Sequence, residues 1–476
     1  MPKPESLLDG ATSCSTRVTV KEDCRRERSL VSTSPLPPGS VALTSGPIAA
    51  VSDATTTCDA CADPVDPSTA LCASCRQVSY CAKSTCQTLL RDNHAPAECS
   101  ILTSIYNNGR HVPTPTMRLL LQVLLNTASL PNVLELISHW ESLANELKIQ
   151  YAQAAAVVVK HASGFLPSNV DEKQASFVLA RIACNAHAVT DTELRPRGKA
   201  LYLPLALVNH SCRPSCCVAF NGFTAVLRTI DVVNQNEELT VGYCDLLAPS
   251  FKRRSELRSA YMFDCCCERC TLADSGSREE KLLSALRCQQ GNCKGALIDD
   301  GSSERAVCTS CTCDHNMSDL RQLAQSTEAN AGRSASELER NEVESAVQSA
   351  EEAVQLAKQS ACKGSAPFTK ANDALMRACI ESGRFDRALS ACRASLAGYE
   401  IADDRKCLPL LGLQYAARGK LERYCERLVD AYKSLRQAVI ILEKAFGDDS
   451  PIVREVKNVQ LMQTEAELKQ YQEQRA

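Results

Sequence analysis

The sequence predicts an α+β, multidomain protein, and three observations lead to this fold class. A chain of 476 residues, 44% of them apolar, is long enough for roughly two to four domains with buried cores. The spacing of its apolar residues changes from helical to strand-like and back to helical along the chain. Two stretches, 58–99 and 265–313, are dense in cysteine, which indicates small units held together by metal.

The composition and the N-terminus argue against several function classes. The 53 basic residues nearly balance the 56 acidic ones, so no global field favours nucleic acid or an anionic membrane. The N-terminus lacks a basic start followed by an apolar run, and apolar stretches such as 117–125 are shorter than the roughly 18 to 20 residues of a membrane helix. We therefore expect no signal peptide, no membrane insertion and no direct nucleic-acid binding. In a reducing compartment the 28 cysteines are free, catalytic or metal-bound thiols.

The regular elements follow from residue spacing. After a disordered N-terminus over 1–16, a strand-and-turn segment is predicted from about Ser29 to Val51, with its turn at the Pro-rich stretch before Gly39. Apolar residues at three-and-four spacing predict helices from about 100 to 185. Short β-rich runs separated by Asn and Gly predict strands and hairpins at 216–220, 224–230 and 239–243.

Beyond about residue 320 the chain is polar, alanine-rich and helical in spacing, with a break near 363–367. Gly383 and Gly419 lie in similar segments and are separated by 36 positions, near the period of tetratricopeptide helix pairs. An ordinary helical bundle explains the pattern equally well.

The first cysteine cluster has the spacing of a double zinc site. Two thiolates separated by two residues suit a tight knuckle on one tetrahedral zinc, and eight ligands make two closed sites. The stretch has too little apolar content to fold by burial alone. Unpaired core thiols or disulfides are the alternative. The candidate ligands are Cys58, Cys61, Cys72, Cys75, Cys81, Cys86, His94 and Cys99.

With Tyr80 directly before Cys81, this spacing resembles the MYND zinc finger. The resemblance implies interleaved ligands, with Cys58, Cys61, Cys81 and Cys86 on one zinc and the other four residues on the second. The last gap of each set is four residues here, where the family usually has three. Because the stretch has three basic and five acidic residues, we expect the finger to bind a protein or peptide; pure scaffolding is the alternative.

Three further motifs occur together. They are Asn-His-Ser-Cys-Arg-Pro at 209–214, Glu-Leu-Thr-Val-Gly-Tyr at 238–243, and the cysteines at 265–270. Jointly they resemble the SET domain of protein-lysine methyltransferases with its post-SET segment. Together with the finger, the chain resembles the SET and MYND domain (SMYD) family from about residue 15 to its end. Cys-Asn-Ala-His at 184–187 and Glu-Leu-Arg-Pro at 193–196 resemble the plant-type branch.

The resemblance implies a β-rich SET domain split by the finger and a helical insert, then a cysteine-rich post-SET segment and an all-helical TPR-like C-terminal domain. The expected domains are a disordered N-terminus (1–16), the SET N-terminal part (17–57), the MYND finger (58–99), the helical insert (100–183), the SET core (184–246), the post-SET and zinc-ribbon-like segment (247–318) and the TPR-like domain (319–476).

The activity implied is methyl transfer from S-adenosylmethionine to a lysine of a histone or another protein. A free lysine has a pKa near 10.4, so the site must favour the neutral amine and orient it, which a narrow apolar channel with tyrosine hydroxyls does. By motif match Tyr243 and Tyr261 are catalytic, and Tyr261 and His187 line the channel, although His187 fits a satisfied, partly buried histidine equally well. The cofactor contacts implied are Arg28, Ser29, Asn185, Asn209, His210, Tyr243 and Phe263.

The sequence departs from the family in two places. Glu27-Arg28-Ser29 stands where the family has Gly-x-Gly, and Ser215 stands where the motif ends in asparagine. A non-catalytic MYND/TPR adaptor with a degenerate cofactor loop is therefore the alternative function.

Two further metal sites are predicted. Three post-SET thiolates need a fourth ligand for tetrahedral zinc, and the resemblance supplies Cys212, leaving Cys266 to point away. A second group has zinc-ribbon form, with Cys313 as a competitor for the last ligand position. We expect three zinc ions, with the ribbon as the candidate for a fourth. The ligands are Cys212, Cys265, Cys267 and Cys270, then Cys288, Cys293, Cys308 and Cys311.

The remaining expectations concern partners and location. Besides the substrate protein, we expect peptide partners for the finger and the C-terminal helices, a heat-shock chaperone tail being one candidate. The chain is expected to be a monomer in the nucleus, the cytoplasm or both. Lys252-Arg253-Arg254 is interpreted as a solvated helix face in preference to a nuclear address.

Overall fold

The computed structural model describes residues 17–23, 27–109 and 112–473, so the predicted disordered N-terminus lies outside it. The chain forms two compact units, each discontinuous in sequence. The first unit contains the chain up to Asn209, with Ser215–Val241 and Ala260–Met262. The second unit contains His210–Pro214, Gly242–Ser259 and the chain from Phe263 onward.

The strands of the first unit bring together residues that are far apart in sequence. The antiparallel hairpin of β1 and β2 starts at Val18, earlier than the predicted start at Ser29. Two three-stranded antiparallel sheets, in the orders β3-β9-β8 and β4-β6-β5, pair residues 41–52 with strands from beyond residue 185. This pairing is that of a β domain interrupted by a long insertion. The strands are β1 (Val18–Asp23), β2 (Glu27–Ser32), β3 (Val41–Ser45), β4 (Ala49–Ser52), β5 (Ala186–Thr190), β6 (Pro196–Leu201), β7 (Asn209–His210), β8 (Cys216–Asn221), β9 (Thr224–Thr229) and β10 (Thr240–Val241).

The insertion is helical, as predicted. Helix α4 illustrates why: the Thr114 hydroxyl accepts a hydrogen bond from the Met117 N–H, Pro115 occupies the first position, and an apolar run is buried behind them. The elements are α1 (Pro67–Ala70), α2 (Ser84–Leu89), η2 (Leu90–Glu98), α3 (Cys99–Gly109), α4 (Pro115–Leu125), α5 (Leu130–Leu134), η3 (Trp140–Ser142), α6 (Asn145–Ala162) and α7 (Glu172–Asn185).

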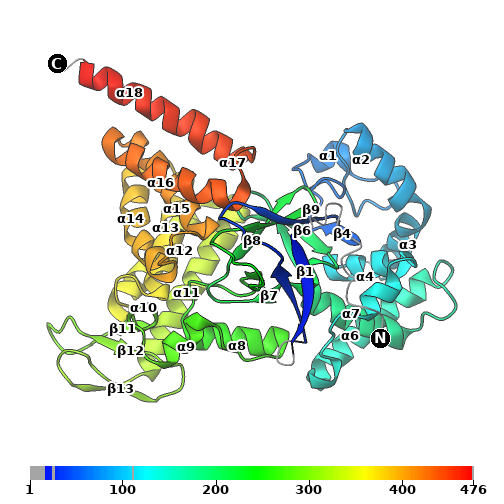
Figure 1. Ribbon diagram of the computed structural model, residues 1–476, viewed down its shortest axis with the longest axis horizontal. Helices are drawn as coiled ribbons and strands as arrows, with labels where there is room; N and C mark the ends of the chain where they lie inside the picture. Colours follow the sequence, from blue (N-terminus) through cyan, green and yellow to red (C-terminus); the bar gives the residue numbers. More distant parts are fainter. Residues whose placement is uncertain (1–16, 24–26, 110–111, 474–476) are drawn as a thin grey trace. The chain divides into compact units, whose positions relative to one another are not determined.

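The second unit combines short helices, two small hairpins and a C-terminal helical stack, coloured yellow to red in Figure 1. The helical tail and its break before residue 366 confirm the prediction. The elements are α8 (Ser250–Tyr261, of which the last two residues belong to the first unit), α9 (Glu268–Asp274), α10 (Arg278–Leu283), β11 (Ala285–Arg287), β12 (Ala296–Ile298), β13 (Arg305–Val307), β14 (Asp314–Asn316), α11 (Ser318–Glu339), α12 (Val343–Ser360), α13 (Ala366–Glu381), α14 (Phe385–Ala402), α15 (Pro409–Tyr424), α16 (Leu428–Phe446), α17 (Pro451–Arg454), η5 (Glu455–Leu461) and α18 (Met462–Glu473).

Three helix pairs, α11/α12, α13/α14 and α15/α16, are closed by equivalent turns. The middle turn residue is left-handed in each case: Asn341 (φ 60°), Gly383 (φ 72°) and Glu426 (φ 59°). In each turn the N–H of the following residue donates to the carbonyl five residues earlier at 2.8 Å.

The predicted pairing of Gly383 with Gly419 is wrong. Gly419 lies inside α15, where an added Cβ would come within 2.6 Å of Cγ of Leu435. Close packing of α15 on α16 therefore explains Gly419. The helix pairs recur at a longer spacing than the predicted 36 residues, because the equivalent positions are 341, 383 and 426.

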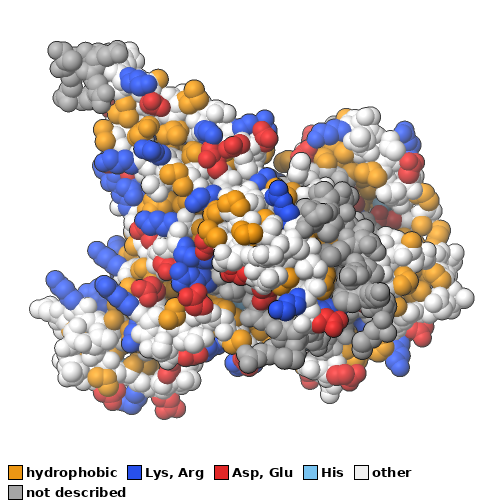
Figure 2. Space-filling model, viewed as in Figure 1, with side chains coloured by type: hydrophobic (Ala, Val, Ile, Leu, Met, Phe, Trp, Pro, Cys, Tyr) orange, Lys and Arg blue, Asp and Glu red, His pale blue; other side chains and the backbone are white. Residues whose placement is uncertain are grey.

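The surface agrees with the near-neutral composition. Figure 2 shows Lys and Arg side chains interspersed with Asp and Glu over the visible face of the C-terminal helices. In the described part of the chain, no helix is both long and apolar enough to cross a bilayer.

Candidate active site and metal centres

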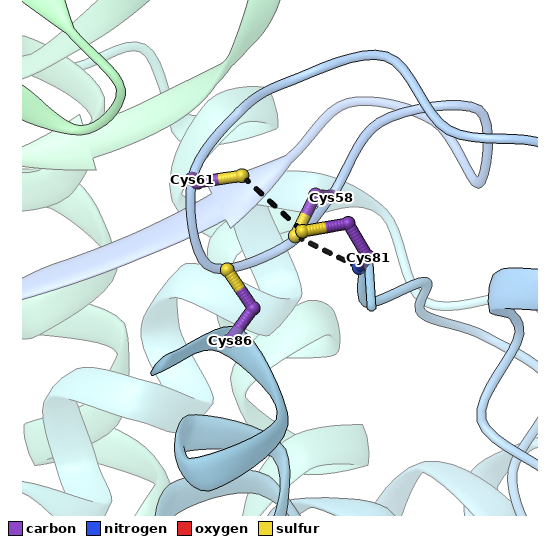
Figure 3. Close-up of side chains that lie close together, drawn as sticks. All are labelled: Cys58, Cys61, Cys81 and Cys86. Atoms are coloured by element: carbon purple, nitrogen blue, oxygen red, sulfur yellow. Dashed lines mark hydrogen bonds between the residues drawn. The ribbon is translucent and has the colours of Figure 1, made fainter. Parts of the chain in front are cut away.

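The first predicted finger site is assembled in the structure. The sulfurs of Cys58, Cys61, Cys81 and Cys86 lie within 4.8 Å of one another, and Figure 3 shows them converging from a loop and from helix α2. Cys61 Sγ and Cys81 Sγ are 3.8 Å apart. Tetrahedral zinc with Zn–S bonds of about 2.3 Å requires sulfurs about 3.8 Å apart, so this set fits a zinc ion.

The second finger set interleaves with the first, in the grouping that the resemblance implied. Cys72 Sγ lies 3.7 Å from Cys99 Sγ, and Cys75 Sγ lies 3.4 Å from His94 Nε2. The four-residue gap between His94 and Cys99 is spanned by the π-helix η2, in which the Cys99 N–H donates to the His94 carbonyl. Because a π-helix bonds residues five apart, it brings these two side chains to the same ion.

A buried ionic network supports both finger sites. Glu98 accepts from His94 Nδ1 at 2.9 Å and from Arg118 at 3.2 Å, and Arg118 forms two hydrogen bonds, at 2.6 and 3.1 Å, with Asp59, the neighbour of Cys58. Burial raises the pKa of Asp59, but Arg118 and bonds from Ser52 outweigh it and hold the pKa below its usual value. The network fixes the His94 ring and ties the finger to α4.

Sequence reasoning did not find this network. The available signal was Arg118 itself, a charged residue inside the apolar run of α4, which needs a buried partner.

The post-SET set is also assembled. Cys212 Sγ lies 3.6 Å from Cys270 Sγ and 4.0 Å from Cys265 Sγ, and Cys267 completes the set. Cys266 is exposed and points away, as predicted. Cys244, with His210 and Cys212, forms a further group of possible ligands that the motifs did not indicate.

The ribbon cysteines form the fourth set. Cys288 Sγ lies 3.7 Å from Cys311 Sγ, and Cys293 Sγ lies 3.7 Å from Cys308 Sγ. Among the described residues, the group that could hold an ion contains Cys311 and not Cys313. Gly295 is required here, since an added Cβ would lie 2.4 Å from Cys308 Sγ.

Three predicted cofactor residues lie together in the second unit. The ring of His210 packs against those of Tyr243 and Phe263, with centroid distances of 5.4 and 6.1 Å. The Tyr243 N–H donates to His210 Nδ1 at 2.9 Å, so the proton of the neutral imidazole lies on Nε2. Nε2 faces Cys212 Sγ at 3.2 Å, which links this aromatic cluster to the post-SET thiolates.

In the first unit, strand β2 carries the predicted cofactor residues Arg28 and Ser29 and is hydrogen-bonded to Asn209 of the Asn-His-Ser-Cys motif. Asn209 Nδ2 donates to the Arg28 carbonyl at 2.9 Å and to Glu238 Oε1 at 2.8 Å. The Arg28 guanidinium donates to the Glu135 carbonyl, and the buried Ser29 hydroxyl donates to the Lys21 carbonyl. The backbone of β2 is thus held in place, while the side chain of residue 27 lies outside the described structure.

The other predicted site residues are Asn185, His187 and Tyr261. Asn185 Nδ2 donates to the carbonyls of Ile137 and Arg181, both at 2.8 Å. Any hydrogen bond between Asn185 and the cofactor would therefore involve Oδ1 as the acceptor. Burial lowers the pKa of His187 to about 4, so the ring is neutral at pH 7. Tyr261 ends α8 and is half-buried.

Comparison with known proteins identifies the fold. The SET domain family model matches residues 27–244. This range contains the two split sheets, the finger and the motifs that carry His210 and Tyr243. The chain is 27% identical over 450 residues to "Histone-lysine N-methyltransferase ASHR1" of Arabidopsis thaliana, covering 91% of this chain and 92% of that protein. The chain is therefore similar to SET-domain lysine methyltransferases, and residues 27–244 match the SET domain itself.

The chain is also similar to two further methyltransferases. It is 26% identical over 411 residues to "N-lysine methyltransferase SMYD2" of Homo sapiens, covering 81% of this chain and 84% of that protein. It is 32% identical over 218 residues to "Histone-lysine N-methyltransferase SMYD3" of Mus musculus, covering 43% of this chain and 49% of that protein.

The interpretation of Lys252-Arg253-Arg254 as a solvated face is wrong. Arg253 is fully buried against Glu280, Arg254 pairs with Asp274 at 2.7 Å, and Lys252 pairs with Glu328 at 2.7 Å. All three cations form ion pairs with carboxylates of other helices. This segment therefore does not present a free basic cluster.

Proposed function

We propose that this chain is an S-adenosylmethionine-dependent protein-lysine N-methyltransferase. The observation that carries the proposal is the aromatic cluster of His210, Tyr243 and Phe263. Its first two residues are joined by a hydrogen bond and lie in the segment that matches the SET domain. The names of the relatives support lysine as the target.

The residues suit this chemistry. When bound, S-adenosylmethionine would supply the methyl group from a sulfonium. Asn209, His210 and Phe263 would hold the cofactor, and the Tyr243 hydroxyl would orient the incoming lysine amine. A neutral imidazole at His210 places no second cation beside a sulfonium. An apolar, tyrosine-lined passage favours the uncharged amine, which is the form that can attack the methyl group.

Labelled methyl transfer tests the activity. The zinc-loaded protein is incubated with S-adenosylmethionine carrying a labelled methyl group, together with histones or a cell extract. We expect label in protein that is recovered as methyllysine after hydrolysis. Absence of label from histones, extract and the enzyme itself, in a mixture that a control lysine methyltransferase labels, would refute the proposal.

We propose that the finger binds a peptide of a partner protein, whether or not that protein is a histone. In the first unit, a cleft of about 780 Å³ runs between the finger, α4 and the β8–β9 hairpin. Its lining combines apolar surface at Leu89 and Phe223 with amides at Asn93 and Gln122. A peptide needs both kinds of contact, for its side chains and for its backbone.

We propose a second peptide site on the C-terminal helices, with a chaperone tail as the candidate occupant. A groove of about 290 Å³ lies between α12, α13 and α14. Val354, Phe368 and Leu375 line it together with Lys358 and the ion pair of Arg387 with Glu351, a combination of apolar and charged surface that suits a short peptide.

We further propose that the chain is a monomer, because each unit has its own buried core. We propose that it is located in the nucleus, the cytoplasm or both. Two relatives are named as histone-lysine methyltransferases, which supports a location in the nucleus.

A further inference from the structure

The second unit contains a buried ionic triad of Arg253, Glu280 and Arg269. Arg253 is fully buried and donates to both carboxylate oxygens of Glu280, at 3.1 and 3.0 Å. Arg269 Nε donates to the same carboxylate at 2.7 Å. The residues come from three separate helices, α8, α10 and α9. Two arginines against one carboxylate leave a buried excess of positive charge, which is costly without a further anion.

The triad contacts the chain segments that carry the aromatic cluster. Arg269 Nη1 donates to the carbonyl of Cys212 at 3.3 Å and to that of Leu246 at 2.9 Å. Cys212 follows His210 by two residues, and Leu246 follows Tyr243 by three. Arg269 itself stands between the candidate ligands Cys267 and Cys270.

The post-SET thiolate set, to which Arg269 is joined through the Cys212 carbonyl, can supply that anion. Nε of Arg253 and Nη2 of Arg269 are buried without a hydrogen-bond partner among the described residues. Four thiolates around Zn²⁺ carry a net charge of about −2, which is opposite in sign to the excess positive charge of the triad.

We propose that Arg253, Arg269 and Glu280 are positioning residues that hold the anionic post-SET zinc site and, through Cys212 and Leu246, the segments bearing His210 and Tyr243. Loss of the triad should loosen one zinc ion and weaken cofactor binding together. The claim that the triad supports cofactor binding (the cofactor half of the proposal) rests on the proposed function. The claim that it holds the post-SET zinc (the zinc half) does not.

The test compares Arg253→Met with Arg258→Met in the full-length protein. Arg258 lies on the same helix but forms an exposed pair with Asp264. Zinc per chain is measured by mass spectrometry, zinc release by a chelating dye, and S-adenosylmethionine affinity by calorimetry. For Arg253→Met we expect one zinc equivalent to leave at least about tenfold faster and cofactor affinity to fall at least about tenfold. Arg258→Met should match the wild type, and Arg253→Lys should recover part of the loss.

The outcomes separate the two halves. In a Cys212→Ser background, which removes a ligand of this zinc, Arg253→Met should change neither zinc release nor affinity further. Unchanged release from Arg253→Met, or equal acceleration of every zinc equivalent, would overturn the proposal, the latter because it indicates general destabilisation. Should the wild type bind no cofactor, the proposed function fails, and selective release of one zinc would still support the zinc half. If Arg253→Met does not fold, Glu280→Gln is measured in the same way.

Discussion

Replacing Tyr243 by phenylalanine is expected to reduce methyl transfer by about 100-fold or more while leaving the fold intact. The change removes only the hydroxyl that we assign to the lysine amine. The ring can still pack against His210, and the hydrogen bond to His210 Nδ1 comes from the Tyr243 backbone N–H, which the substitution keeps. Single-turnover transfer of a labelled methyl group, at saturating cofactor, measures the loss.

The matched control for this variant is Tyr424→Phe. Tyr424 is 69% exposed and stacks on Phe385, away from the predicted site residues in sequence, so its hydroxyl should not affect transfer. Cofactor affinity of Tyr243→Phe should stay within about twofold of the wild type, since the aromatic packing persists. Unaltered peptide methylation or automethylation by Tyr243→Phe would show that the catalytic assignment is wrong.

Removing zinc is expected to unfold the finger and the post-SET segment. Structural zinc contributes about 10–16 kcal/mol in small zinc domains, comparable with the whole stability of an ordinary domain, about 5–15 kcal/mol. Stripped of metal, the closely spaced thiolates of the four sets would repel one another or take up protons. Chelation should release three or four zinc ions per chain, lower the midpoint of thermal unfolding and expose 58–99 to proteolysis.

Neighbouring cysteines provide the control for this prediction. Cys267→Ser removes a member of the post-SET set and should cost one zinc ion, whereas Cys266→Ser changes an exposed thiol and should cost none. Zinc content by mass spectrometry and the unfolding midpoint compare the two. Equal behaviour of the two variants, or a chelated protein that melts like the wild type, would contradict the ligand assignment.

The sequence was most informative where ligand spacing is local. Pairs such as Cys58 and Cys61 already place two ligands on one turn, so the candidate ligands of the finger and of the ribbon could be found before the fold was known. The interleaving came from the family resemblance, because spacing alone does not say which pairs share an ion. The longer gap before Cys99 gave no hint of the π-helix that spans it.

Sequence reasoning was weakest for buried charge. Arg118 meets Asp59 across 59 positions and Arg253 meets Glu280 across 27, so neither pair has a local pattern. In Lys252-Arg253-Arg254, three adjacent cations look alike, and only tertiary packing selects the middle one for burial. Similarly, Gly383 and Gly419 suggested a repeat of helix pairs with turns at these two positions. The structure has equivalent turns at 341, 383 and 426, because Asn341 and Glu426 adopt the left-handed conformation without being glycine.

Calorimetric titration of the zinc-loaded wild-type protein with S-adenosylmethionine tests the central claim most directly. The titration is decisive because Glu27-Arg28-Ser29 replaces the Gly-x-Gly of the family at the predicted cofactor site. Asn209 holds the backbone of β2 at this point. We predict saturable binding of one cofactor per chain. No detectable binding would contradict the methyltransferase account and favour an adaptor that uses the finger and the C-terminal helices to bind proteins.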